Sequence, residues 1–172
     1  MVEHRAVLRH DRMVCFDDGG DRFHLRAAAI ALRNGRVLIQ NLKAGHGTFL
    51  PGGRVEQGEA SPETLVREIE EEFGHTVAVG PLAFVIESFY AEKGQQFHEV
   101  GLYFGVEVGE DFPYHDTDIC HRCYEGDVEM EYRWVEATPQ SLAAHTFHPE
   151  LLRDRLGILP RGTVHLLDRE AV

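Results

Sequence analysis

The segment from residue 52 to residue 74, GGRVEQGEASPETLVREIEEEFG, constrains the fold more than any other part of the chain. It opens with a glycine-containing loop and ends with four glutamates within five positions, namely Glu68, Glu70, Glu71 and Glu72. Between them, Ser61 is a good helix N-cap, Pro62 suits the first turn, and Gly74 is typical of the position after the last turn. These signals predict a helix over residues 62–73.

The predicted helix has an apolar face and a neighbouring acidic face, because successive side chains turn by about 100°. The apolar face holds Leu65, Val66, Ile69 and Phe73. Glu70 points away from the acidic face, which is formed by Glu68, Glu71 and Glu72. Like charges four residues apart and a helix C-terminus each disfavour this arrangement by about 0.3–1 kcal/mol. The acidic face is therefore either a solvated surface or a site for a divalent cation.

The spacing of these residues resembles the Nudix box, the signature of the MutT-type pyrophosphohydrolases. Gly53 is followed after five residues by Glu59, and after seven more by the run REIEEEFG that begins at Arg67. The pattern is matched except at its last apolar position, where His75 stands. We call residues 52–74 the box. The resemblance implies a Nudix-like α/β/α sandwich with a central mixed sheet.

The resemblance also implies a role for each matching residue. Mg²⁺ or Mn²⁺, which prefer oxygen ligands, would be bound by Glu68, Glu71 and Glu72. Glu68 is also the leading candidate for the general base, and the backbone carbonyl of Gly52 would join the metal shell. Arg67 and Glu59 would hold the loop and the helix together, with Arg67 orienting one of the metal-binding carboxylates.

A further glutamate beyond the box often completes the metal shell or serves as base in the resembled family. We favour Glu129, at the start of an alternating strand predicted over residues 129–135, with Glu125 and Glu99 as rivals. Glu99 lies in a strand predicted over residues 97–108. In that strand the apolar residues from Val100 to Val108 form the core face, so Glu99 faces either solvent or a cleft.

The chain of 172 residues is predicted to form one domain, residues 1–172, with residues 1–20 as a peripheral segment. A net charge of −12 argues against nucleic acid or an anionic membrane as a partner, and an anionic small molecule would need metal ions between it and the glutamates. With three cysteines, no apolar run of about 18 residues and no signal-peptide pattern, we expect a cytoplasmic protein.

The rest of the chain alternates strands with a few helices. Residues 25–33 and 36–42 form a predicted hairpin around Asn34-Gly35, a pair typical of a two-residue type I′ turn. Residues 82–90 are a further strand, and the strand at 129–135 is expected to be the last. Short helices are predicted after Thr138-Pro139 and over residues 149–156. The fold class is α/β or α+β, with helices on both faces of a mixed sheet.

Residues 109–128 are predicted to form a long loop of the kind that often determines specificity. Cys120 and Cys123 in this loop, with His115, resemble half of a zinc site. No second pair of ligands at a suitable spacing follows, and two reduced thiols are the preferred interpretation.

Together these features predict metal-dependent hydrolysis of a nucleoside diphosphate linked to another moiety, by attack of water at phosphorus. Two alternatives stay open, because the box specifies a metal and diphosphate site rather than the bond that breaks. One is a metal-dependent isomerase on the same scaffold, and the other is a nucleotide-sensing module without turnover. Dimers are common in the resembled family, so a homodimer is one expected assembly.

Overall fold

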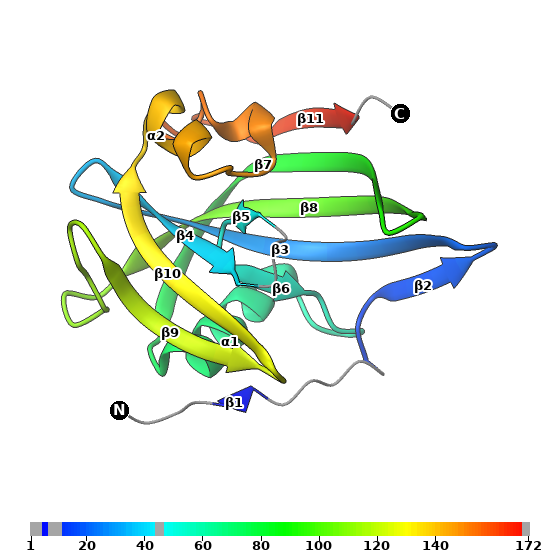
Figure 1. Ribbon diagram of the computed structural model, residues 1–172, viewed down its shortest axis with the longest axis horizontal. Helices are drawn as coiled ribbons and strands as arrows, with labels where there is room; N and C mark the ends of the chain where they lie inside the picture. Colours follow the sequence, from blue (N-terminus) through cyan, green and yellow to red (C-terminus); the bar gives the residue numbers. More distant parts are fainter. Residues whose placement is uncertain (1–4, 7–11, 44–46, 170–172) are drawn as a thin grey trace.

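The computed structural model describes residues 5–6, 12–43 and 47–169, and shows a broad mixed sheet between two helical layers (Figure 1). The peripheral segment predicted over residues 1–20 is therefore described only in part. The elements in chain order are β1 (Arg5–Ala6), β2 (Cys15–Asp18), β3 (Asp21–Arg33), β4 (Arg36–Leu42), β5 (Thr48–Phe49), β6 (Gly52–Arg54), α1 (Ser61–Phe73), β7 (Val77–Glu92), β8 (Gln95–Val108), β9 (Ile119–Glu125), β10 (Val128–Glu136), α2 (Pro139–Ala144), η1 (Glu150–Leu152) and β11 (Val164–Arg169).

In the described residues the strands follow the order β1-β9-β10-β4-β3-β8-β7-β11, with β2, β5 and β6 as short additions. The sheet is mixed, because β3 runs parallel to β8 while β7 and β8 are antiparallel. In Figure 1, α1 lies behind β9 and β10, and α2 lies near the end of β10 at the top of the view. Around the central strand β3, α1 packs on one face, and α2 with η1 packs on the other. The predicted fold class, with helices on both faces of a mixed sheet, is confirmed.

The central strand β3 is shared by two hydrophobic cores. Ala27, Ala29 and Ala31 pack with the apolar face of α1, including Leu65 and Ile69. The alternate residues of the same strand, Ala28 and Ile30, pack with the layer of α2 and η1. Small side chains allow both layers to approach the sheet closely, and residues 27–31 are at most 1% exposed.

On one side of β3, the strand that pairs with it changes from β4 to β6. β4 pairs with β3 only at Leu32 and Arg33, next to the turn. Further along β3, residues 26–28 pair with β6 instead. The first residues of the box are therefore built into the sheet, directly beside its central strand.

The predicted hairpin and box helix are confirmed, with small differences at the helix start. Asn34 and Gly35 both have positive φ, 52° and 73°, as a type I′ turn requires. The helix α1 begins one residue early, so Ala60 rather than Ser61 is the N-cap, and the Ala60 N–H donates to Glu63 Oε2 at 2.9 Å. Gly74 ends the helix in the left-handed conformation, as expected.

Three expectations for the second half of the chain were wrong. The predicted loop at 109–128 contains the seven-residue strand β9, which pairs with β10. The strand at 129–135 is not the last, because β11 adds to β7. The helix predicted over residues 149–156 is only the three-residue 3₁₀ turn η1. By contrast, α2 is capped as predicted, with the Thr138 hydroxyl accepting from Ser141 N–H.

Candidate active site

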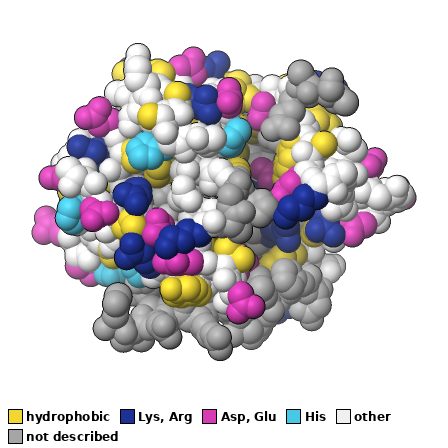
Figure 2. Space-filling view, in the orientation of Figure 1, with side chains coloured by type: hydrophobic (Ala, Val, Ile, Leu, Met, Phe, Trp, Pro, Cys, Tyr) yellow, Lys and Arg dark blue, Asp and Glu magenta, His cyan; other side chains and the backbone are white. Residues whose placement is uncertain are grey.

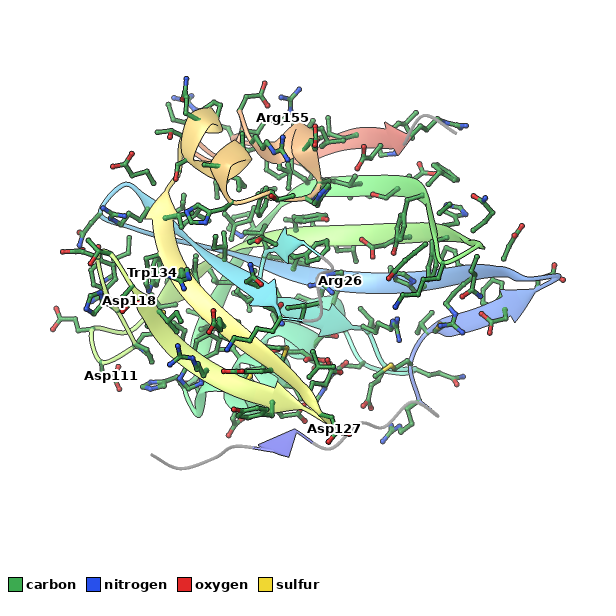
Figure 3. All side chains as sticks on the ribbon, viewed as in Figure 1. Arg26, Asp111, Asp118, Asp127, Trp134 and Arg155 are labelled. Carbon is green, nitrogen blue, oxygen red and sulfur yellow. The ribbon has the colours of Figure 1, made fainter. Side chains whose placement is uncertain are left out.

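A cavity of about 810 Å³ lies where the box meets one face of the sheet. Its floor is formed by β3, β7 and β8, and its rim includes β6 and the C-terminal half of α1. Residues that are cross-strand neighbours point to the same face of a sheet. His24 pairs with Glu99, Arg26 with Gly101 and Ala28 with Tyr103, so these side chains share the cavity face. Arg26 lies near the centre of the molecule, beside β6 (Figure 3).

Glu72 is the most deeply buried acid of the box. Its residue is only 5% exposed, it lines the cavity, and its Oε2 atom has no hydrogen-bond partner in the described part of the chain. Burial raises the pKa of Glu72 well above its usual value and the nearby charge of Glu68 raises it further, whereas Tyr132 and Arg26 act in the opposite direction. A buried acceptor without a partner is costly, so this oxygen is placed for a ligand.

Glu68 lies one turn earlier on α1 and also lines the cavity. Its carboxylate packs directly against the backbone of Gly53, so closely that a Cβ atom at residue 53 would overlap it. Burial raises the pKa of Glu68, although the adjacent Arg67 acts in the opposite direction. The glycine of the box pattern is thus required by a contact between the sheet and an acid of the helix.

Arg67 and Glu59 connect the box loop to the helix, as predicted. Arg67 donates to both carboxylate oxygens of Glu59, at 2.8 and 3.1 Å, and to Glu68 Oε1 at 2.8 Å. Burial tends to raise the pKa of Glu59, but hydrogen bonds, chiefly from Arg67, hold it below its usual value. The Arg67 guanidinium therefore fixes the orientation of Glu68.

The structure does not bring the three predicted metal ligands into one cluster. The side chain of Glu71 is 41% exposed, lies 3.5 Å from Arg67, and is not part of the cavity lining. Across the described residues, no group of three or more His, Cys, Asp or Glu side chains is placed to hold a metal ion. The cysteines Cys120 and Cys123 carry free thiols and belong to no such group either.

The donor set nevertheless fits a divalent cation at the cavity end of α1. The partnerless Oε2 of Glu72 and the carboxylate of Glu68 face the same cavity, and the backbone of Gly52 lines it as well. Gly53 removes the side chain that would separate Glu68 from this backbone. The donors of Glu68, Glu72 and Gly52 are all oxygens, the type that Mg²⁺ and Mn²⁺ prefer.

The favoured further glutamate, Glu129, lies away from the cavity. It forms ion pairs with Lys43 at 2.8 Å and Arg122 at 3.4 Å, in a surface of interspersed charges over β9 and β10 (Figure 2). Its rival Glu125 lines the cavity, and its charge acts on Glu72. The other rival, Glu99, lies on the cavity floor. The geometry thus favours Glu125, because it lines the cavity and its charge acts on an acid of the box.

Beside Glu99, the cavity floor contains two basic residues that the sequence did not single out, His24 and Arg26. Glu99 Oε2 lies 2.5 Å from His24 Nε2, and Arg26 donates to the carbonyl oxygen of Leu50 at 3.1 Å. Burial opposes the ionised form of Glu99, but His24 and Arg26 hold its pKa below the usual value. The signal was present as alternation of basic residues in the run RFHLR of β3, at the edge of an apolar strand.

Comparison with known proteins places the chain in a family. The model of the NUDIX domain matches residues 22–154. The MutT NUDIX hydrolase from Burkholderia pseudomallei is 23% identical with a TM-score of 0.59, and the match covers 76% of this chain and 95% of that one. The MutT protein from Bacillus halodurans is 16% identical with a TM-score of 0.54 and coverages of 83% and 89%.

A structure described as a UDP-X diphosphatase is 18% identical with a TM-score of 0.50, and the match covers 74% of this chain and 55% of that one. At these identities the likeness to solved structures establishes the fold, which is the Nudix fold. No curated protein sequence matches the chain. Within the described residues, no helix is long and apolar enough to cross a membrane.

Proposed function

The chain belongs to the NUDIX domain family, whose members are hydrolases acting on diphosphate bonds, and from this premise we propose that it cleaves a nucleoside diphosphate linked to another moiety. Cleavage would proceed by attack of water at phosphorus and would depend on Mg²⁺ or Mn²⁺. The observation that carries the proposal is the partnerless carboxylate oxygen of Glu72, buried at the end of a cavity large enough for a nucleotide.

We assign the metal to Glu68, Glu71 and Glu72, with the carbonyl oxygen of Gly52. When bound, the cation would supply positive charge against the phosphate oxygens and lower the pKa of water. Glu68 is already held in place by Arg67 and by its contact with Gly53. Glu71 would join the same site by changing rotamer, because its exposed side chain gives up only one weak ion pair within the described part of the chain.

The residues of the chain have separate tasks in this scheme. Glu68 is our candidate for the general base, since it combines a fixed orientation with access to the cavity. Glu59 and Arg67 keep it there. We propose Glu125 rather than Glu129 as the further acid. Glu125 lines the cavity, whereas Glu129 forms ion pairs with Lys43 and Arg122.

The metal requirement can be tested by assaying the full chain against nucleoside triphosphates, nucleotide sugars and dinucleoside polyphosphates. We expect release of a nucleoside monophosphate or inorganic phosphate with Mg²⁺ or Mn²⁺, and no release above background after treatment with EDTA. Restoring Mg²⁺ should restore the rate. Equal rates with and without the chelator would contradict the assignment of the box acids.

The same assay separates the alternatives. Nucleotide binding without any product would indicate a sensing module, and a rearranged product without uptake of oxygen from ¹⁸O-labelled water would indicate an isomerase. We further propose that residues 1–172 form a single domain that works in the cytoplasm, where a reducing environment suits its three free thiols. Light scattering would show whether the chain is a homodimer.

A further inference from the structure

The floor of the cavity carries two arginines directly opposite each other. Arg26 of β3 and Arg54 of β6 are cross-strand neighbours, and both line the cavity. Like charges in this position repel each other. Among the residues that the structure describes, neither guanidinium forms an ion pair with a carboxylate, although the charges of Glu99, Glu68 and Glu72 act on Arg26. A bound anion next to the box would stabilise this pair.

The next residue of β3 on the cavity face is His24, which contacts Glu99. His24 lies two residues from Arg26, a step of about 7 Å along a strand. Its Nε2 atom contacts Glu99 Oε2, its side chain is 5% exposed, and its Nδ1 atom is buried with no partner in the part of the chain that the structure describes. Oε1 of Glu99 has no hydrogen-bond partner among the described residues, and the 13% exposed side chain lines the cavity. This carboxylate oxygen can only accept a hydrogen bond.

One further step along β3 brings an aromatic pair. Phe97, which pairs with Arg22 at this level, stacks on Tyr90 with ring centres 4.9 Å apart and planes 2° apart. Both rings line the cavity. From the box outward, the floor thus presents two guanidinium groups, then a hydrogen-bond acceptor, then aromatic rings.

On the premise of the proposed function, we propose that Glu99, held by His24, accepts a hydrogen bond from the 2′-hydroxyl of the substrate's ribose, so that the enzyme prefers ribose over 2′-deoxyribose nucleotides. A sugar is the group that follows the phosphate in a nucleotide, as Glu99 follows the arginine pair. A cationic amine would satisfy the same acceptor but would be repelled by Arg26 and Arg54. A neutral hydroxyl has no such penalty.

The test compares ribose and 2′-deoxyribose forms of nucleotides carrying the four common bases. Binding of the monophosphates is measured by calorimetry with Mg²⁺, and hydrolysis of the triphosphates is measured separately. For at least one base, we expect the ribose form to bind about 10- to 100-fold more tightly, the value of one hydrogen bond to a charged group. Where the triphosphate is hydrolysed, kcat/KM should favour ribose by a similar factor.

The variant that removes the acceptor replaces both partners, His24→Phe with Glu99→Leu, because a single change would leave the other side chain buried without a partner. In this variant the two sugar forms should bind about equally tightly, mainly because the ribose form binds more weakly than to the unchanged protein. The control is Glu87→Gln, which alters a glutamate on the opposite face that pairs with His165, and should leave the preference unchanged.

The outcomes distinguish failure of this inference from failure of the proposed function. Hydrolysis of both sugar forms at equal kcat/KM, or a ribose preference that survives the double replacement, would overturn the role of Glu99 while leaving the hydrolase intact. A ribose preference in binding that the double replacement abolishes, without hydrolysis, would support the role of Glu99 and overturn the proposed function. Absence of both binding and hydrolysis would overturn both.

Discussion

Replacing Glu72 by glutamine is expected to lower kcat at least about a thousandfold while the protein still folds, because a bound cation contributes several kcal/mol to the transition state. Glutamine has the shape of glutamate but not its charge. Glu72 is buried and one of its oxygens has no partner among the described residues, so the amide removes the cost of holding a carboxylate there. We therefore expect unchanged or higher thermal stability in the absence of metal.

The measurements are kcat with saturating Mg²⁺, the Mg²⁺ or Mn²⁺ dependence of the rate, and the unfolding temperature in EDTA. The matched control is Glu70→Gln on the exposed side of the same helix, for which we expect a change in kcat of less than about twofold, as for an ordinary surface substitution. If Glu72→Gln and Glu70→Gln were equally active, Glu72 could not be a metal ligand.

The second large effect is on stability, and concerns Gly52. An alanine there is expected to destabilise the protein by about 3 kcal/mol or more. Gly52 has φ of 143°, and a Cβ atom would overlap the carbonyl oxygen of Ala27 and lie 2.9 Å from the Cα of Ala28. These are backbone atoms of the adjacent strand and cannot rotate away. Relief would require separating β6 from β3, which also displaces the box.

Denaturant unfolding monitored by circular dichroism would measure this loss. Gly58→Ala is the matched control, because Gly58 also has positive φ, 84°, but has open space around its Cβ position. It should cost only the backbone strain, about 1 kcal/mol. Equal losses in the two variants would show that overlap with β3 is not the cause.

The box could be predicted because its signals are local. The helix depends on the spacing of Pro62, the apolar face and Gly74, and the structure moves only its first residue. The hairpin at Asn34-Gly35 is equally local. Such features are decided by a few neighbouring residues, so the sequence contains all that is needed to predict them.

The errors arose where pairing between distant residues decides the outcome. Strand β9 was missed because its core-facing side chains include His121, which stacks on Phe73, and Cys123, so the expected apolar alternation is absent. The choice between Glu125 and Glu129 depends on which side of the β9–β10 turn faces the box, and sequence spacing does not determine this. Likewise, alternation placed Glu99 opposite the core face, but only the structure shows that this face is a cavity floor.

The two-sided packing of β3 has a consequence for the evolution of such enzymes. The acids that would carry out hydrolysis are anchored through the core on the α1 side of β3, whereas His24 of β3 and Glu99 of β8 lie on the opposite face of the sheet. Substitutions on the face that carries His24 and Glu99 can therefore accumulate without disturbing α1, which packs on the other face. Small changes on the cavity face can therefore alter which substrates bind, while the box helix that would carry out the reaction stays the same.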